Sequence, residues 1–217
     1  FAHYGLHNGY INVDNKKMSK SLNNFFTVRD VAKEYGYEPI RFFLISSSYR
    51  SPINYSTEIV QQGIGALDRL YNCKNAMAFG LKNASEGAED AAFAERVEAR
   101  RAQFIAAMDD DLNTADGIAA LFELVKDINL MLADGTATAA TIRRGQALFD
   151  QLTDVLGFCY ARQEAGNDDA EIEALIEARA AARKEKNWAE ADRIRDELKA
   201  RRIVLEDTPQ GVKWHRE

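Results

Sequence analysis

The chain has 217 residues, 46% of them hydrophobic, and a formal net charge of -6. This length and composition allow a substantial core in one large or two to three small domains. The sequence has no apolar run as long as a membrane span and no charged-then-apolar leader, so we expect a cytoplasmic protein without membrane contact. Cys73 and Cys159 lack CxxC spacing, which disfavours a disulfide framework and predicts buried thiols.

Charge is distributed unevenly along the chain. Residues 1–55 carry seven Lys or Arg against four Asp or Glu, residues 56–169 carry ten against nineteen, and residues 170–217 carry eleven against eleven. The acidic excess therefore lies in the middle. This distribution predicts three units, of which the two outer ones are suited to contact phosphate.

The first predicted element is a β-hairpin centred on Asn8-Gly9. Asn-Gly is the strongest two-residue hairpin signal, and its flanks, Phe1–His7 and Tyr10–Val13, are rich in aromatic and β-branched residues. The chain opens at Phe1 in hydrophobic sequence without an initiator Met, which indicates a piece of a longer protein.

A lysine run follows this hairpin and is the stretch that folding explains least. It reads Lys17-Met18-Ser19-Lys20-Ser21, with Lys16 before it. Two ammonium groups three residues apart, interleaved with hydroxyls in a loop, can surround a polyphosphate with charges and hydrogen-bond donors. The alternative interpretation of such a charge run is a solvated surface turn.

Two short helices are predicted after the lysine run. Thr27 can cap a helix that carries Asp30 in its first turn and ends at Gly36, and Pro39 opens a second helix through Ile45. The asparagines just after the run either hinge the lysine loop or form the turn before Thr27.

From Ser56 onward, apolar residues recur at helical spacing in four successive stretches, which predicts an antiparallel bundle. The third helix is expected to start at Thr114 and the fourth to end before Gly157. These apolar stripes predict core rather than a cofactor site. Their members are Ile59, Val60, Ile64, Leu67, Leu70 and Tyr71; Phe93, Val97, Phe104, Ile105 and Met108; Ile118, Leu121, Phe122, Val125 and Ile128; and Ile142, Leu148, Phe149, Leu152 and Val155.

The C-terminal part predicts a separate small module. Its expected elements are a polar linker at Gly166–Asp169, a charged helix over Glu171–Lys186, a second helix capped by Asn187 with Glu190, and two strands between Ile203 and Trp214 joined by the turn Asp207–Gly211. A module of about forty-five residues has little core of its own. Trp188 and Trp214 are therefore either its apolar anchors or its contact surfaces.

Together, several stretches resemble the bacterial cysteinyl-tRNA synthetases, and the resemblance covers the whole chain. They are His7–Gly9, Lys17–Phe25, Tyr49–Ser56, Met108–Thr114, Leu205–Gly211 and Gly211–Trp214. The lysine run is similar to the KMSKS loop that many class I aminoacyl-tRNA synthetases share, so it indicates only the superfamily. The acidic stretch before Thr114 and the stretch before Gly211 are narrower and indicate the cysteine enzymes.

The resemblance implies a mainly α fold in three parts. Residues 1–55 would be the end of a Rossmann-type catalytic domain, with short strands, the KMSKS loop and helices. Residues 56–165 would be a DALR-type antiparallel helical bundle, with Ala66-Leu67-Asp68-Arg69 on its first helix. Residues 170–217 would be a small α+β anticodon-binding module.

The resemblance also implies the chemistry of the full-length protein, a ligase that activates cysteine with ATP and Mg²⁺ and transfers it to tRNA(Cys). Lys20, assisted by Lys17, would act catalytically on the ATP phosphates, with Ser19 and Ser21 adding hydrogen bonds. A Zn²⁺ ion that selects cysteine would have its ligands outside this chain. Because the resemblance places the amino-acid pocket and half of the ATP site outside this chain, we expect the chain alone to be inactive. We also expect a monomer.

For the C-terminal module, the resemblance implies that Arg183, Trp188, Asp192 and Asp207 contact the GCA anticodon. Trp188 would stack on a base, the carboxylates would accept from base amino groups, and Arg183 would reach a base edge or the backbone. The alternative is that Trp188 is a core anchor and the others belong to a solvated helix face. Trp214 is expected in the core.

Three other groups of residues have open or structural interpretations. One group combines a cation with aromatic residues and either supports the lysine loop or contacts the tRNA inner face; its members are Tyr49, Arg50, Ser51, Asn54 and Tyr55. The acidic run Asp109–Asp111 is composed like a metal site, but we expect it to serve the positive start of the next helix. His3 and His7 lie four apart, but without a third ligand we expect no metal there.

Two rival functions fit parts of the sequence. One is the ligase that joins cysteine to an aminosugar in mycothiol synthesis, which uses the same adenylation without tRNA. The other is a non-catalytic RNA-binding helical protein with an incidental lysine loop. The match of residues 170–217 to an anticodon module argues against the first, and the narrow stretches argue against the second.

Overall fold

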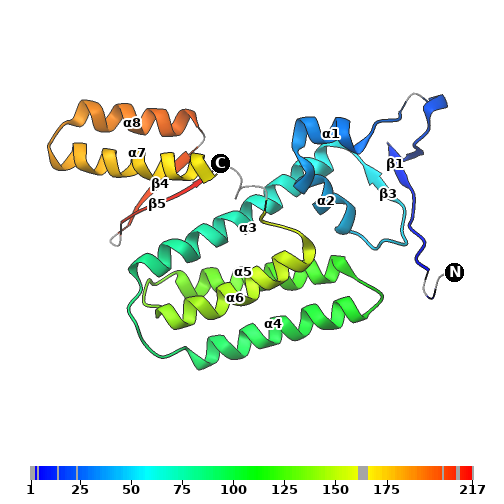
Figure 1. Cartoon of the computed structure of the whole chain (residues 1–217), viewed down its shortest axis with the longest axis horizontal. Helices are drawn as coiled ribbons and strands as arrows, with labels where there is room; N and C mark the ends of the chain where they lie inside the picture. Colours follow the sequence, from blue (N-terminus) through cyan, green and yellow to red (C-terminus); the bar gives the residue numbers. More distant parts are fainter. Residues whose placement is uncertain are drawn as a thin grey trace.

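The computed structural model describes residues 3, 5–13, 15–22, 24–160, 166–201, 203–208 and 211–216. Helices dominate these ranges, which confirms the expected mainly α fold (Figure 1). The helices are α1 (Val28–Tyr35), α2 (Tyr37–Ile45), α3 (Thr57–Asn83), α4 (Ala91–Asp109), α5 (Thr114–Leu132), α6 (Ala139–Leu156), α7 (Gly166–Lys184) and α8 (Trp188–Ala200). The strands are β1 (Ile11–Val13), β2 (Lys16–Lys17), β3 (Ile53–Tyr55), β4 (Ile203–Thr208) and β5 (Gly211–Arg216), and Lys20–Leu22 forms the 3-10 turn η1.

The N-terminal part contains a three-stranded sheet in the order β2-β1-β3, in which β1 runs antiparallel to β2 and parallel to β3. The predicted hairpin at Asn8-Gly9 is wrong, because neither residue lies in a β-turn between paired strands. Gly9 instead donates its backbone N–H to the Tyr49 carbonyl at 2.7 Å. A Cβ at Gly9 would lie 2.2 Å from the Ser51 carbonyl oxygen, so glycine permits this close backbone approach.

Two short helices follow the lysine loop, as predicted. Thr27 and Asp30 form a reciprocal capping box at the start of α1, and Gly36 ends that helix with φ 79. The second helix, α2, begins at Tyr37, two residues before the predicted Pro39. Pro is tolerated there because the first helical N–H groups have no intrahelical partner.

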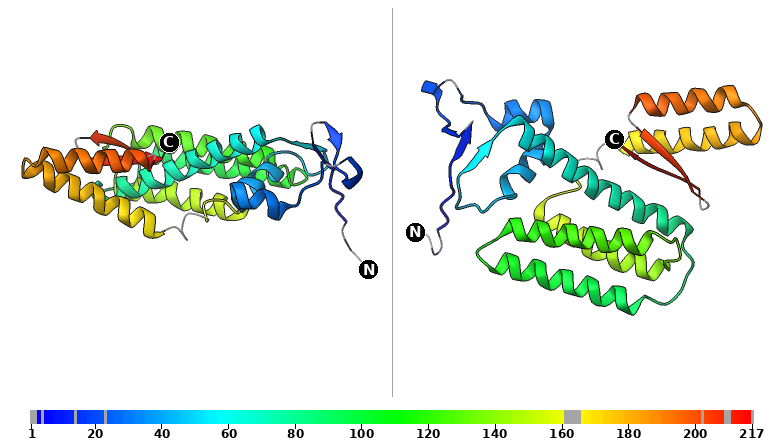
Figure 2. Two further views of the ribbon diagram at one scale, coloured as in Figure 1. Left: turned by 90° about the horizontal axis from the view of Figure 1, so that it is seen from above. Right: turned by 180° about the vertical axis from the view of Figure 1, so that it is seen from behind.

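A four-helix bundle forms the centre, as predicted, and α3 joins it to the N-terminal part (Figure 1). The view from behind in Figure 2 shows α3 running from the first sheet toward the C-terminal module. Helices α5 and α6 pack against each other and against both α3 and α4. Helix α5 starts at the predicted Thr114, and Gly157 ends α6 in the left-handed conformation.

The apolar stripes of the bundle form one core, whose most deeply buried large side chains are Leu70, Met77, Phe93, Leu121, Leu124, Ile128, Ile142, Leu148 and Phe149. Three residues assigned to these stripes are exposed instead: Ile59, Ile105 and Val155. Each lies at the edge of a stripe, next to a buried neighbour, because an apolar stripe read from the sequence is wider than the seam that the neighbouring helices cover. Cys73 and Cys159 are buried thiols, as predicted.

The C-terminal module is a helical hairpin of α7 and α8 with the antiparallel β4–β5 pair beside it. Its small apolar cluster joins Ile172, Ile194, Leu198 and Ile203, with Trp214 partly buried against them. Helix α7 already begins at Gly166, so the predicted polar linker Gly166–Asp169 is wrong. Acidic residues favour the positive end of a helix as well as a loop, and composition alone did not separate the two.

Strands β4 and β5 extend into the segment Asp207–Gly211 that was predicted to be a turn, because Thr208 pairs with Gly211. Residues 209 and 210 of the predicted turn lie outside the described residues. Helix α7 ends at Lys184, two residues before the predicted Lys186. Asn187 caps α8 as predicted, by accepting from the Glu190 backbone N–H.

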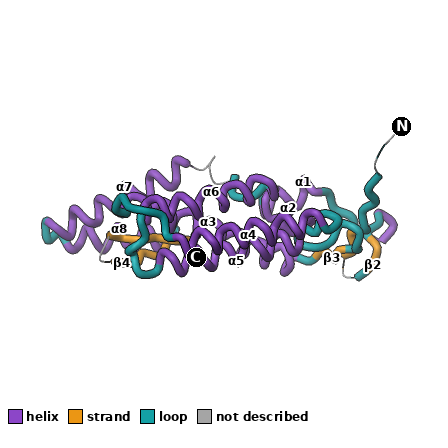
Figure 3. Tube along the Cα trace, turned by 90° about the horizontal axis from the view of Figure 1, so that it is seen from below, coloured by secondary structure: helices purple, strands orange, loops and turns teal. Residues whose placement is uncertain are grey.

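The C-terminal module contacts the bundle at helix α3. Lys82 Nζ on α3 lies 2.9 Å from Glu173 Oε1 on α7, and β5 contacts α3 directly. Trp214 lines a cavity of about 300 Å³ between the two, together with Phe79 and Ile176. Seen from below, the three parts form one elongated body (Figure 3). None of the helices in the described ranges combines the length and apolar character of a membrane span.

Candidate functional site

The lysine loop lies at the edge of the N-terminal sheet. Lys16 and Lys17 form the exposed strand β2, in which Lys17 pairs with Asn12 and Lys16 pairs with Val13. Because successive side chains of a strand point to opposite faces, the two lysines belong to opposite faces of the sheet. Lys17 Nζ lies 5.6 Å from the centre of the Tyr10 ring, a cation–π contact on the Asn12 face.

The second lysine of the run lies in the next turn. The backbone of Lys20 belongs to η1, and its side chain lies outside the described residues. The hydroxyls of Ser19 and Ser21 are 3.1 Å apart, and Ser19 Oγ accepts the Leu22 backbone N–H at 3.3 Å. The two predicted hydroxyl ligands are thus together on one side of the turn, where one donates to the other and the second proton is available to an anion.

Asn24 closes the loop from its C-terminal side. Its Oδ1 accepts the Ser19 backbone N–H at 2.9 Å, and its Nδ2 donates to the Lys17 carbonyl at 3.3 Å. One carboxamide therefore connects both ends of the segment between the lysines. Of the two asparagines that the sequence marked as a hinge or turn, Asn24 has this structural role, and Asn23 lies outside the described residues.

Asn54 belongs to the stretch for which support of the lysine loop was one of two interpretations, and it holds the other end of the loop. Asn54 on β3 accepts the backbone N–H of Asn15 at 2.8 Å, in the turn between β1 and β2. This contact agrees with the interpretation of the stretch as support for the lysine loop, although the spacing did not specify which backbone group Asn54 binds.

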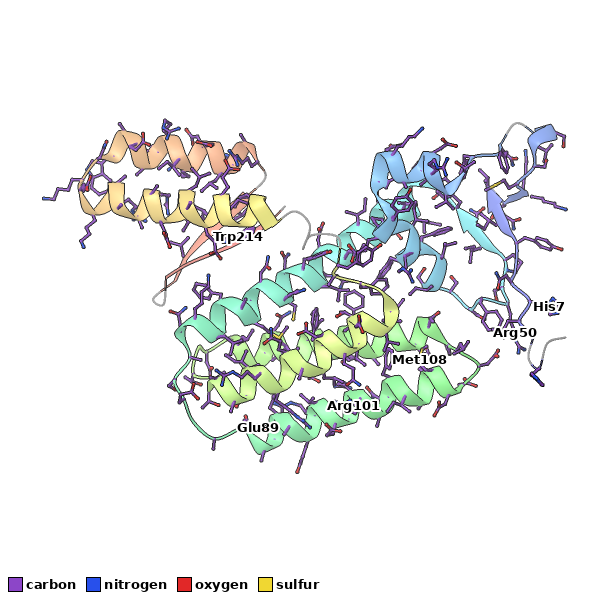
Figure 4. The ribbon with its side chains drawn as sticks, in the orientation of Figure 1. His7, Arg50, Glu89, Arg101, Met108 and Trp214 are labelled. Atoms are coloured by element: carbon purple, nitrogen blue, oxygen red, sulfur yellow. The ribbon has the colours of Figure 1, made fainter. Side chains whose placement is uncertain are left out.

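The loop before β3 contacts the corner between α4 and α5. The Arg50 guanidinium reaches the Asp111 carboxylate, and the Tyr49 hydroxyl donates to the same carboxylate at 2.9 Å. The Tyr49 hydroxyl and then the Asp111 charge raise the pKa of Arg50. Arg50 lies beside the end of the bundle that carries Met108 (Figure 4). These contacts support a structural role for Tyr49 and Arg50 at the junction of the N-terminal part and the bundle.

The acidic run is divided between different roles. Asp109 ends α4, Asp110 caps it, and Asp111 pairs with Arg50. The cap of α5 is Asn113, which accepts from the backbone N–H of Asp116. The negative charge in the first turn of α5 is therefore that of Asp116, not of the predicted run.

The predicted anticodon residues lie in two places on the C-terminal module. Arg183 is in the last turn of α7, and Trp188 is the first residue of α8. Asp192 follows one turn later on the same face and pairs with Arg195 at 3.2 Å. Asp207 lies on β4 opposite Val212, and its side chain is outside the described residues.

Trp188 and Trp214 have different environments. Trp188 is 60% exposed, so it is not a core anchor and its ring is free to stack on a ligand. Trp214 is partly buried and lies on the side of the module that faces α3 (Figure 4). It therefore serves both the small cluster and the contact with the bundle.

Within the described ranges, no three His, Cys, Asp or Glu side chains come together in a way that would hold a metal ion. The described residues thus do not fit the zinc site that the resemblance implies for the longer protein, and we assign no step to it.

The DALR-type stretch has an internal role, since the Arg69 guanidinium on α3 lies 4.4 Å from the centre of the Phe122 ring on α5.

Three family models match the chain in order. The model of the tRNA synthetases class I (C) catalytic domain matches residues 1–64, the DALR domain matches residues 103–160, and the cysteinyl-tRNA ligase anticodon binding domain matches residues 168–214. The cysteine--tRNA ligase of Symbiobacterium thermophilum is 46% identical over 219 residues, which cover 100% of this chain. The chain belongs to the cysteinyl-tRNA ligase family.

Other members of the family match equally well. The cysteine--tRNA ligases of Geobacillus thermodenitrificans and Anoxybacillus flavithermus are 47% and 46% identical over 217 residues, again over 100% of the chain. The match covers 46% of each of these relatives, so the chain spans about half of their length. It corresponds to their C-terminal part.

Among solved structures, the LeuRS of Agrobacterium radiobacter, determined as a ternary complex with tRNA and LeuAMS, has a TM-score of 0.53 to this chain. The match covers 71% of this chain and 22% of that one, at 20% identity. This likeness shows a common fold.

Proposed function

We propose that this chain supplies the ATP-phosphate loop and the tRNA-reading part of an enzyme that activates cysteine with ATP and transfers it to tRNA(Cys). The match to cysteine--tRNA ligases over 100% of the chain carries this proposal. We assign the end of the catalytic domain to residues 1–55, the bundle to residues 56–165 and the anticodon module to residues 170–217.

In the proposed first step, a carboxylate oxygen of cysteine attacks the α-phosphorus of ATP, and the bond to the bridging oxygen of the leaving pyrophosphate breaks. Negative charge grows on the pyrophosphate, so cations placed there stabilise the transition state more than the bound ATP. Lys20, with Lys17 assisting, would supply these cations. The hydroxyls of Ser19 and Ser21 would donate to phosphate oxygens, and Mg²⁺ would accompany the ATP.

The surroundings of Lys17 are compatible with this role. Its contact with Tyr10 is on an exposed strand, where a cation–π contact contributes about 0.5–1 kcal/mol. Exchanging that ring for a phosphate therefore costs little.

The loop backbone is held at both ends by Asn24 and Asn54, so the cost of ordering the loop is largely met before ATP binds.

In the second step, a terminal ribose hydroxyl of the tRNA would attack the carbonyl carbon of the cysteinyl-adenylate, so that an ester bond forms, the bond to the phosphate oxygen breaks and AMP leaves. We propose that Trp188 stacks on an anticodon base, that Asp192 and Asp207 accept from base amino groups, and that Arg183 binds a base edge or the backbone. The exposed ring of Trp188, one turn from Asp192 on the same helix face, supports this assignment. The zinc that selects cysteine in the resemblance is given no ligand in this chain.

Lys20→Ala in the full-length protein tests the phosphate role. We expect the rate of cysteine-dependent ATP–pyrophosphate exchange to fall about a hundredfold, because a lost transition-state contact costs on the order of 3 kcal/mol. Lys16→Ala is the matched control, since Lys16 belongs to the opposite sheet face from Lys17 and should change the rate little. An unchanged rate for Lys20→Ala would refute the assignment.

Titration of the chain with tRNA(Cys) transcripts tests the RNA role. Both tryptophans lie in the anticodon module, so their fluorescence reports binding there. We expect a preference for the GCA anticodon over an altered one that persists at higher salt, because phosphate contacts weaken with salt and base contacts discriminate. Asp207→Ala should reduce this preference in the chain and, in the full-length protein, leave cysteine activation intact. Equal, salt-sensitive binding of both transcripts would favour the tRNA-independent ligase that acts on an aminosugar.

A further inference from the structure

The turn at Asn15, which leads into strand β2 with Lys16 and Lys17, is held by a side chain from a distant part of the sequence. Asn54 Oδ1 accepts the Asn15 backbone N–H at 2.8 Å, across 39 positions of the chain. Asn15 has φ 59, a left-handed conformation that is costly for residues other than glycine and is tolerated best by Asn and Asp. The Asn54 carboxamide therefore stabilises a turn that the backbone alone disfavours.

The sheet register relates this contact to the first lysine of the loop. Asn12 pairs with Lys17 on one side and with Asn54 on the other, so the three residues form one row across β2, β1 and β3. Residues directly paired across neighbouring strands share a sheet face. Asn54 and Lys17 thus belong to the same face, with one strand between them.

Apart from this turn, the backbone of strand β2 is held by the Asn24 Nδ2 bond to the Lys17 carbonyl and by a short pairing with β1. Its pairing with β1 consists of two register pairs, Asn12 with Lys17 and Val13 with Lys16. A shift of one residue in such a pairing moves every side chain to the opposite face. The turn at Asn15 sets this register, because it determines where the chain enters β2.

We propose that Asn54 is a positioning residue for the lysine loop, and that it acts by fixing the Asn15 turn and so keeping Lys17 on the face of Asn12. Asn54 contacts the turn and not the substrate. The inference rests on the proposed function of the loop in ATP-dependent activation. It extends that function to β3, a strand outside the lysine run.

The kinetic consequence follows from where the lysines act. If they stabilise charge that develops in the transition state, a disordered β2 lowers kcat and leaves KM for ATP nearly constant. Asn54→Leu keeps the approximate size and removes the acceptor. Asn54→Asp keeps an acceptor oxygen at the same position and should restore function. Asn187→Leu is the matched control, because it removes an acceptor of a backbone N–H in the C-terminal module.

The first arm of the test needs no activity. Amide hydrogen exchange of Asn15, measured by NMR in the 217-residue chain, should be about fivefold faster in Asn54→Leu and unchanged in Asn54→Asp and Asn187→Leu. In the second arm, full-length Asn54→Leu should exchange pyrophosphate with a kcat about tenfold lower and a KM for ATP within about twofold. Asn54→Asp should recover most of kcat.

Each remaining outcome overturns the proposal. An Asn15 amide that exchanges equally in wild type and Asn54→Leu would remove its structural basis. A slower kcat that Asn54→Asp does not recover, or a kcat that Asn54→Leu does not change, would exclude positioning through this hydrogen bond. A wild-type full-length protein without cysteine-dependent exchange would refute the proposed function and with it the positioning role, while the first arm would still decide the turn contact separately.

Discussion

The guanidinium of Arg50 and the carboxylate of Asp111 form a two-pronged ion pair, with Nε 2.8 Å from Oδ2 and Nη2 3.0 Å from Oδ1. The residues are 61 positions apart, in the loop before β3 and at the corner between α4 and α5. The pair therefore connects the part of the protein that carries the lysine loop with the adjacent end of the bundle. The side chains are 66% and 45% exposed, so its contribution to stability is small.

A double-mutant cycle measures this connection. Arg50→Lys cannot form both contacts in the same geometry, and Asp111→Asn removes the charge. We expect a small favourable coupling free energy that decreases with added salt, because both side chains are largely exposed. Amide exchange in residues 46–52 should rise in either variant. Additive single variants with no change of exchange in that loop would mean that the pair does not hold the two parts together.

Gly9→Ala should destabilise the N-terminal part. A Cβ at Gly9 would lie 2.2 Å from the Ser51 carbonyl oxygen and 2.4 Å from its carbon, so the backbone must move. We expect a loss of about 1–3 kcal/mol in the free energy of unfolding, measured in urea, as for other overpacked sites. Gly5→Ala is the control, because nothing lies within 4 Å of a Cβ there. An equal effect of both substitutions would contradict the close approach.

These examples show what the sequence could and could not predict. The starts of α1 and α5 were predictable, because caps such as Thr27 and Asn113 bond to groups within three positions. The Asn8-Gly9 hairpin failed because β1 pairs with β3, a strand much further along the chain, and local turn propensity carries no information on that partner.

The candidate site divides in the same way. The residue types of the lysine run marked it as a candidate phosphate site, whereas the sequence left Trp188 open between a core anchor and a contact surface, and its 60% exposure distinguishes the two. The roles of Asn54 and Asp111 depend on partners 39 and 61 positions away, which spacing does not specify. Long-range side-chain contacts to the loop were therefore the part that only the three-dimensional arrangement revealed.

Tyr71→Phe should lower the stability of the joint between α2 and the bundle. Glu38 is 3% exposed, and its carboxylate accepts from the Tyr71 hydroxyl at 2.7 Å and from the Cys159 backbone N–H. Removing one donor leaves a buried carboxylate less satisfied, at a cost of about 1.5–3 kcal/mol. Urea unfolding measures it. Tyr37→Phe, at an exposed position, is the control and should have no effect.

The C-terminal module should lose stability in acid. The hydrogen bond from Arg201, and then its charge, lowers the pKa of Glu171 below its ordinary value of 4.5. Arg193 lowers the pKa of Glu190 in the same way. An acid with a lowered folded-state pKa contributes stability above the unfolded value and loses it as pH falls through the folded value. The module should therefore weaken below about pH 4.5, the range in which unfolded carboxylates bind protons.

Tryptophan fluorescence can follow this transition selectively, because both tryptophans belong to the module. Arg201→Met should make the acid dependence of the module shallower. Arg143→Met, which removes an arginine of α6 in the bundle, should leave it unchanged. A transition in wild type at the same pH and steepness as in Arg201→Met would show that this ion pair does not contribute.

Trp188 and Trp214 should respond in opposite ways to truncation. Trp188 is exposed on α8, so Trp188→Ala should leave the unfolding midpoint nearly unchanged. If its ring stacks on an anticodon base as proposed, the variant should bind an anticodon stem-loop with about 1–3 kcal/mol less affinity. Trp214 packs on the apolar cluster and against α3, so Trp214→Ala should lower the midpoint of the module and weaken its contact with Phe79. Loss of stability in Trp188→Ala, or unchanged RNA affinity in a folded Trp188→Ala protein, would contradict the assignment of this ring to RNA rather than to the core.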